Sequence, residues 1–118
     1  MDTTTIYLIA DCYALPDKIE VVRQILESLI EVSRKEVGCI RYELFENLQD
    51  KTHFTIIHRW QSEDIVENHF TAKHTLKATE MLKDILAKPT DVRRYTCLAK
   101  DDRTINKTKS YSGFCCTL

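Results

Sequence analysis

The sequence predicts an α+β fold, in which one antiparallel sheet carries helices on one face in the order β-α-β-β-α-β. Three observations lead to this prediction. Apolar residues alternate over 5–14, as in a half-buried strand. Two more strand-like segments, 39–47 and 52–60, flank a short loop typical of a hairpin. Apolar residues at helical spacing follow the first strand and the third. This order is the ferredoxin-like split β-α-β motif.

The first strand ends before Pro16, and a helix then runs to about Glu36. Asp17 and Glu20 are spaced as a capping box, in which two side chains hydrogen-bond to free N–H groups at the start of a helix. Gly38 is expected to end this helix in the left-handed conformation that glycine adopts at low cost. The apolar face of the helix comprises Ile19, Val22, Leu26, Leu29 and Ile30.

The second half of the domain predicts two helical segments and a last strand. Ser62 is placed to cap the first segment, a helix that carries His69. The second segment runs from about 72 to 87 and stops at Pro89. Residues 91–98 form the last strand. The side chains expected to face inward from the second segment are Leu76, Leu82, Ile85 and Leu86.

Composition and charge exclude several classes of protein. We expect one domain over residues 1–98 and a polar, partly basic tail over 99–118 that lacks periodicity. A net charge of −1 gives no support to nucleic acid as a partner. The N-terminus lacks the basic region of a signal peptide, and no stretch approaches the ~20 apolar residues of a membrane helix.

The five cysteines are odd in number and show no metal-ligand spacing. Cys12, Cys39 and Cys97 fall in predicted strands, and we interpret them as small core or sheet residues. Free thiols of this kind are typical of a reducing compartment, so we expect a cytoplasmic protein.

The middle of the chain carries the residues from which a family can be recognised. Residues 36–42 join a helix to a strand through Gly38, a later strand closes on Trp60, and His69 and His74 follow. In these features residues 5–98 resemble the antibiotic biosynthesis monooxygenase family, which includes quinol monooxygenases. The resemblance implies a dimeric α+β barrel, in which the sheets of a homodimer pair, and chemistry that often needs no cofactor. We therefore expect neither a cofactor nor a metal.

The candidate site lies on the strand that closes on Trp60 and on the helix after it. Phe54, His58 and Trp60 share one strand face by the period of two. The resemblance implies that the matching Trp lies in a pocket between sheet and helices. It also implies an acidic residue two positions before this Trp, where the present chain has His58. His69 and His74 match histidines that recur in the family's second-half helix.

The chemistry that the resemblance implies is the oxidation of a small quinol or polyphenol by dioxygen. A base removes a proton, the electron-rich anion reacts with dioxygen, and the peroxide collapses to a quinone. A histidine suits this base because its pKa lies near the working pH. We assign His69 as base or proton shuttle, Trp60 as aromatic wall and orienter, and His58 as a second polar contact. Further candidates for contact with the aromatic substrate are Tyr42, Phe54, His74 and Asp11, with Tyr13, whereas His53 is expected to be solvated.

Several alternative interpretations stay open. Trp60 is also typical of a core residue, His69 of a hydrogen-bonded helix histidine, and His74 of the surface. A metal site built from His58, His69 and His74 is another alternative. Some relatives bind heme through a pattern that includes an Asn on the first strand, which this chain lacks, and others act on phosphorylated signal sugars. The main alternative function is a non-enzymatic, dimeric ligand-binding or stress-response module.

The tail ends with a motif of its own. Cys115 stands fourth from the end and Leu118 is last, which fits a prenylation box of the geranylgeranyl type. Basic residues upstream would strengthen attachment to an anionic membrane surface. The motif predicts lipidation of Cys115 on the cytosolic face of a membrane, with a chance match as the alternative.

Overall fold

One antiparallel sheet and three helices make up residues 5–98, the part of the chain that the computed structural model describes. The predicted prenylation box at Cys115 lies outside these residues. The elements in chain order are β1 (Ile6–Tyr13), α1 (Ile19–Arg34), β2 (Cys39–Glu46), β3 (His53–Trp60), α2 (Glu63–Phe70), α3 (Lys73–Leu82) and β4 (Asp91–Tyr95). Within the described residues, no helix is both long and apolar enough to cross a membrane.

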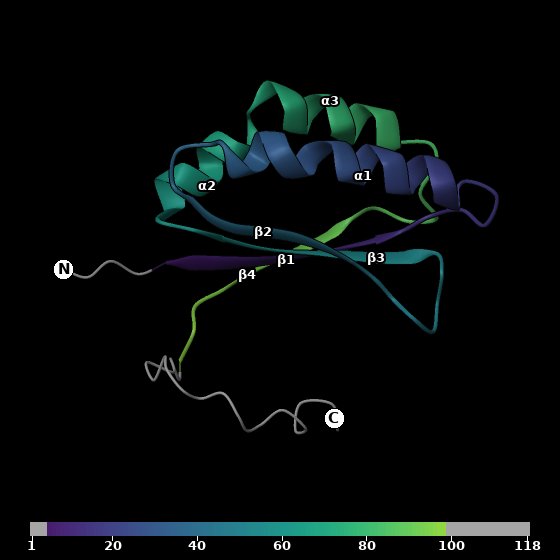
Figure 1. Cartoon of the computed structure of the whole chain (residues 1–118), viewed down its shortest axis with the longest axis horizontal. Helices are drawn as coiled ribbons and strands as arrows, with labels where there is room; N and C mark the ends of the chain where they lie inside the picture. Colours follow the sequence, from purple (N-terminus) through teal and green to yellow (C-terminus); the bar gives the residue numbers. More distant parts are fainter. Residues whose placement is uncertain (1–4, 99–118) are drawn as a thin grey trace.

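The four strands pair antiparallel in the order β2-β3-β1-β4, and all three helices cover the same face of the sheet (Figure 1). This arrangement confirms the predicted ferredoxin-like α+β fold. The pairing places His58 of β3 opposite Leu8 on one side and opposite Tyr42 on the other. Trp60 follows two residues later, opposite Ile6. His58 and Trp60 therefore point to the same face of the sheet.

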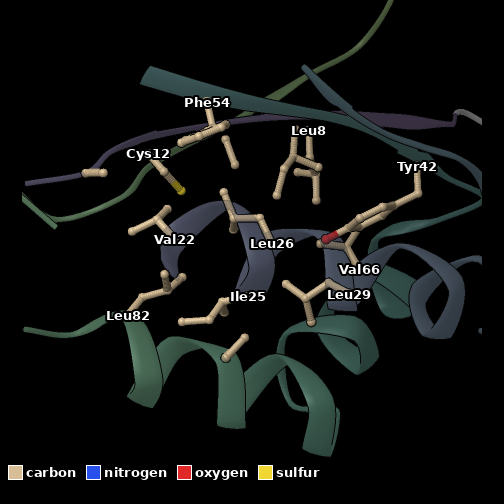
Figure 2. Close-up of a cluster of buried hydrophobic side chains, with 14 of the residues drawn as sticks. Leu8, Cys12, Val22, Ile25, Leu26, Leu29, Tyr42, Phe54, Val66 and Leu82 are labelled. Atoms are coloured by element: carbon tan, nitrogen blue, oxygen red, sulfur yellow. The ribbon is translucent and has the colours of Figure 1, made fainter. Parts of the chain in front are cut away.

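Alternation along β1 and β3 gives the sheet two different faces. On both strands the even-numbered residues point toward the helices and are buried, and Leu8 and Trp60 are fully so. Figure 2 shows apolar side chains of the strands meeting those of α1 and α3 between the two layers. The odd-numbered residues lie on the opposite face, called the open face below, and are only partly buried. The core of the domain is thus on one side of the sheet.

The start of α1 differs from the prediction. Lys18 is the N-cap, and no side chain within residues 5–98 caps this helix. The predicted capping box of Asp17 and Glu20 is therefore wrong. Glu20 instead pairs with Arg23 one turn later, at 3.1 Å between Oε1 and Nε. The start of α2 follows the prediction, since the Ser62 hydroxyl accepts a hydrogen bond from the N–H group of Ile65.

Gly38 has a φ of +88°, which confirms the predicted left-handed conformation. However, α1 already ends at Arg34, so Gly38 shapes the turn into β2 instead of the helix end. A Cβ atom at this position would lie 2.7 Å from Cγ2 of Ile65 in α2. Gly38 is therefore required both by the backbone conformation and by the close approach of α2.

The helical region after β3 is divided into two helices. α2 ends at Phe70, with Thr71 as its C-cap, and α3 begins at Lys73. α3 then ends at Leu82, so neither Ile85 nor Leu86 is helical as predicted: Ile85 lies in a turn, and Leu86 forms an isolated antiparallel bridge with Ala14. This turn is held against the end of β1, where the N–H group of residue 15 bonds to the carbonyl of Ile85 at 3.0 Å.

Two further expectations about this half are wrong. Leu76 is 55% exposed, whereas Ala78 and Leu82 supply the buried face of α3. Because α3 begins anew at Lys73, its start determines which of its side chains face the core. Cys97 was expected in a strand but is exposed and follows the end of β4. β4 stops at Tyr95, which pairs with Tyr7 near the start of β1.

Candidate active site

A cavity of about 740 Å³ lies between the sheet and the helices. Apolar side chains of β1, α1 and α3 form much of its wall. Of the site residues predicted from the sequence, Tyr42, His58 and His69 line it. The volume falls within the range of cavities that hold small organic ligands.

His58 presents a hydrogen-bond donor that has no partner among the described residues. The indole N–H of Trp60 donates to its Nδ1 at 3.0 Å. Since Nδ1 is the acceptor, the neutral ring carries its proton on Nε2. Nε2 is buried and unpaired within residues 5–98. Burial, with a smaller contribution from His69, lowers the pKa of His58 to about 3. The ring is therefore neutral near pH 7.

In His69 the roles of the two ring nitrogens are reversed relative to His58. Its Nδ1 lies 2.8 Å from Oε2 of Glu36, in the turn after α1. A carboxylate can only accept, so Nδ1 is the donor and Nε2 of the neutral ring carries a lone pair. Burial lowers the pKa of His69, although the bond to Glu36 acts in the other direction. An imidazole held by a carboxylate in this way is oriented to act as a base.

His74 converges on the same carboxylate oxygen. Its Nε2 lies 2.5 Å from Oε2 of Glu36, and its side chain is 23% exposed. On one continuous helix His69 and His74 would point well apart, and the break after α2 brings both toward Glu36. Glu36 is not among the site residues predicted from the sequence. The one signal for it was its place just before Gly38, in the segment that carries the family resemblance.

The rings of the site pack closely around His69. Its ring centroid lies 4.5 Å from that of Trp60, 5.5 Å from that of His58 and 6.0 Å from that of Tyr42. Tyr42 is buried, and burial raises the pKa of its hydroxyl to about 12. The Tyr42 hydroxyl is therefore protonated near neutral pH, and Tyr42 adds a further polar residue to the cavity wall beside His58 and His69.

Comparison with known proteins agrees with this architecture. A family model for antibiotic biosynthesis monooxygenases matches residues 5–81. The chain belongs to this family. A Bacillus subtilis protein named "Putative monooxygenase YcnE" is 30% identical to this family member over 79 residues, which cover 67% of the chain and 83% of that protein.

Two other matches cover a similar or larger share of the chain. A Synechocystis protein named "Uncharacterized protein sll1783" is 31% identical over 80 residues, or 68% of this chain. The match spans 54% of that longer protein. The crystal structure of PA3566 from Pseudomonas aeruginosa is similar with a TM-score of 0.78 at 28% identity, covering 82% of this chain and 97% of that one.

In this family member Trp60 does not line the cavity. Its side chain is fully buried next to His58 and His69, and its indole N–H already donates a hydrogen bond to His58. The structure therefore contradicts its predicted roles as an aromatic wall and as a donor to a substrate oxygen. Trp60 instead positions His58.

Three other predicted contacts lie away from the cavity, as does His74. Phe54 is buried in the core beneath the guanidinium of Arg23, whose Cζ is 5.3 Å from the ring centroid. Asp11 and Tyr13 are on the open face of the sheet. There the Asp11 carboxylate accepts a bond from Nε2 of His53 at 2.7 Å, and the Tyr13 ring stacks on His53. The expectation that His53 is solvated is wrong, because Asp11 and Tyr13 cover it.

The residues that could hold a metal ion also differ from the set considered from the sequence. Among residues 5–98, the group whose donor atoms converge is Glu36, His69 and His74, within 4.8 Å of one another. His58 is not part of this group, and its Nδ1 is already bonded to Trp60. A three-histidine site is therefore not formed.

Proposed function

We propose that this protein is a cofactor-independent monooxygenase that oxidises a small quinol or polyphenol with dioxygen. One observation supports it best: a single cavity is lined by His58, with an unpaired N–H, and by His69, with a basic nitrogen. Activation of a phenol requires these two functions, because the proton must leave and the remaining oxygen charge must be stabilised.

The reaction balances with dioxygen as the only co-substrate. His69 takes the phenolic proton, which gives an electron-rich anion. Dioxygen oxidises this anion and forms a C–O bond at a ring carbon that carries hydrogen, giving a hydroperoxide after protonation. The O–O bond then breaks as that hydrogen leaves as a proton. One oxygen atom becomes the quinone carbonyl and the other leaves as water.

His58 and Tyr42 stabilise the charge that develops. The Nε2–H of His58 is available because Trp60 holds the ring from its other nitrogen. A donor that is already oriented in a buried site costs no reorganisation when the charge forms. The pKa of about 3 keeps His58 neutral, so it donates without competing with His69 for the substrate proton.

Oxygen uptake tests this proposal. Purified protein is supplied with hydroquinones, naphthohydroquinones and anthrones, and uptake is compared with the uncatalysed rate. We expect catalysed uptake that falls by roughly 100-fold or more in His69→Ala, since general base catalysis contributes about that much. His53→Ala is the matched control, because His53 lies on the opposite face of the sheet. Equal uptake by wild type and His69→Ala would refute the assignment of the base.

We also propose that the protein is a homodimer that pairs through the open face of the sheet. Tyr7 and Ile9 of β1 and Ile57 of β3 are partly buried on this face. Burial of these apolar side chains against a second copy would stabilise the dimer. The dimer, a cytoplasmic location and the absence of a cofactor remain expectations from the sequence and the family.

The alternative is a ligand-binding module without turnover. The same cavity and the unpaired His58 donor favour it, since both would also serve a ligand that does not react. Trp60 is the single tryptophan, so its fluorescence reports on ligand binding beside His58. Saturable quenching by a quinol without oxygen uptake would favour this function. Its lipid tether at Cys115 stays a prediction, tested by intact mass of wild type and Cys115→Ser from eukaryotic cells.

A further inference from the structure

We propose that Glu36, His69 and His74 form a binding site for a divalent transition-metal ion such as Zn²⁺, and that the bound ion turns off His69 as a base. The site adjoins the cavity, because His69 lines the cavity whereas Glu36 and His74 do not. The binding rests on this geometry alone. Its effect on turnover rests on the proposed function.

The three donor atoms are close to the spacing that a metal requires. Oε2 of Glu36 lies 2.8 Å from Nδ1 of His69 and 2.5 Å from Nε2 of His74, and all three atoms are within 4.8 Å of one another. Two ligands held at about 2.1 Å by a tetrahedral zinc ion are about 3.4 Å apart. Small side-chain movements therefore suffice to admit the ion.

The types of donor also suit a transition metal. Two imidazole nitrogens and one glutamate oxygen form a known zinc ligand set, and such sites leave the fourth position open. Imidazole also favours zinc, copper and nickel over magnesium and calcium, which prefer oxygen. The partial exposure of His74 and Glu36, at 23% and 16% of their side chains, gives an ion a path from solvent.

The backbone already holds the ligands in place. Glu36 follows α1, His69 lies on α2, and His74 lies in the first turn of α3. The Gly38 turn keeps the first of these segments against α2 through its contact with Ile65. The ion would replace the two hydrogen bonds that both imidazoles now donate to one carboxylate oxygen.

The effect on His69 follows from its tautomer. Without metal, Nδ1 donates to Glu36 and Nε2 carries the lone pair. A metal on Nδ1 takes that lone-pair position, so the proton of the neutral ring moves to Nε2. His69 then donates a hydrogen bond and cannot accept a proton from a substrate. The ion would thus act as an inhibitor of the proposed base.

Metal binding is measured on the full chain after removal of any affinity tag. Titration calorimetry with Zn²⁺ and the visible spectrum with Co²⁺ are recorded for wild type, His74→Ala and His53→Ala. We expect one ion per chain for wild type and for His53→Ala. Mutation of a residue that only hydrogen-bonds to a metal ligand typically weakens metal affinity by roughly 10-fold to 100-fold. Loss of His74, a ligand itself, should therefore weaken Zn²⁺ binding by roughly 10-fold or more. Equal Zn²⁺ affinity in wild type and His74→Ala, or no binding by wild type, would overturn the site.

Two further measurements separate the site from its effect. Zn²⁺ should raise the unfolding midpoint of wild type and His53→Ala more than that of His74→Ala, whether or not the protein turns over a quinol. Nitrogen NMR of His69 should show the proton on Nδ1 without metal and on Nε2 with Zn²⁺. If wild type binds the ion but the proton stays on Nδ1, the inhibitory effect is refuted. In the oxygen-uptake assay, Zn²⁺ should inhibit wild type at concentrations that leave His74→Ala unaffected.

Discussion

The indole N–H of Trp60 donates to Nδ1 of His58 across 3.0 Å. Both side chains are buried on the helix-covered face of β3, two residues apart. Because an indole can only donate, this bond makes Nδ1 the acceptor and leaves the proton of His58 on Nε2. A residue that does not line the cavity thus determines which nitrogen of His58 can donate to a ligand.

Trp60→Phe should destabilise the fold because it removes this donor. Nδ1 of His58 is then buried without a partner, which costs roughly 1–3 kcal/mol in unfolding free energy, and the lost ring volume adds to this. Urea unfolding followed by circular dichroism measures the change. The Trp60→Phe/His58→Leu double variant isolates the hydrogen bond through a double-mutant cycle. A coupling energy near zero would show that the bond contributes nothing.

Stability should fall as the pH drops below the ordinary pKa of histidine. In the unfolded chain His58 gains a proton near pH 6.5, whereas in the folded protein its pKa is about 3. Acid therefore favours the unfolded chain over this window, by roughly 1 kcal/mol between pH 7 and pH 5.5. The lowered pKa of His69 acts in the same direction.

Urea unfolding at pH 7 and pH 5.5 checks this dependence on His58. His58→Leu should lose about 1 kcal/mol less than wild type between the two values, since it has no proton to gain at that position. His53→Asn serves as the control and should retain the contribution of His58. Parallel losses in wild type and His58→Leu would contradict the prediction.

Glu36→Gln should impair the base. The carboxylate fixes Nδ1 of His69 as the donor, whereas an amide can donate to Nδ1 and reverse the tautomer. We expect quinol-dependent oxygen uptake to fall by roughly 10-fold or more. The bond to Glu36 partly offsets the lowering of the His69 pKa by burial. Its loss should lower this pKa further, so the acid limb of the pH profile should move to lower pH. Glu31→Gln, an exposed glutamate on α1, is the control. An unshifted acid limb would argue against this role for Glu36.

The sequence was sufficient for the fold because burial of one sheet face imposes a period of two on every central strand. The same period correctly placed His58 and Trp60 on one face. It could not show that the indole is bonded to the imidazole and lies outside the cavity wall. Both facts depend on side-chain packing against α2, which no spacing along the strand records.

The missing part of the site depends on contacts between distant segments. Glu36 is 33 positions from His69 and meets it only because the Gly38 turn folds the end of α1 toward α2. His74 joins them because the helix breaks at Thr71, and the geometry of that break was not predictable from the pattern. His53 was misjudged for a similar reason, since its partner Asp11 comes from the neighbouring strand.

Gly38→Ala should destabilise the protein and displace Glu36. The added Cβ meets Ile65 at 2.7 Å, and an L residue is strained at a φ of +88°. We expect a loss of roughly 1 kcal/mol or more, measured by urea unfolding. Comparing the effect of Gly38→Ala in wild type and in an Ile65→Ala background separates the two causes. A smaller loss in that background identifies the steric contact, and an equal loss identifies the backbone strain. A Gly38→Ala protein as stable as wild type would contradict both.

The proposed homodimer makes a prediction about the open face of the sheet. Ile57 lies on this face beside Ile9, its partner in the pairing of β3 with β1. A charge placed there would be buried without a partner in a paired dimer, which is strongly unfavourable. Sedimentation equilibrium should therefore give twice 13.8 kDa for wild type and a shift toward 13.8 kDa for Ile57→Glu. Leu48→Glu, at a hairpin position that is 95% exposed, should remain dimeric. A wild-type mass of one chain would exclude the dimer, and an Ile57→Glu protein that stays folded and dimeric would place the contact elsewhere.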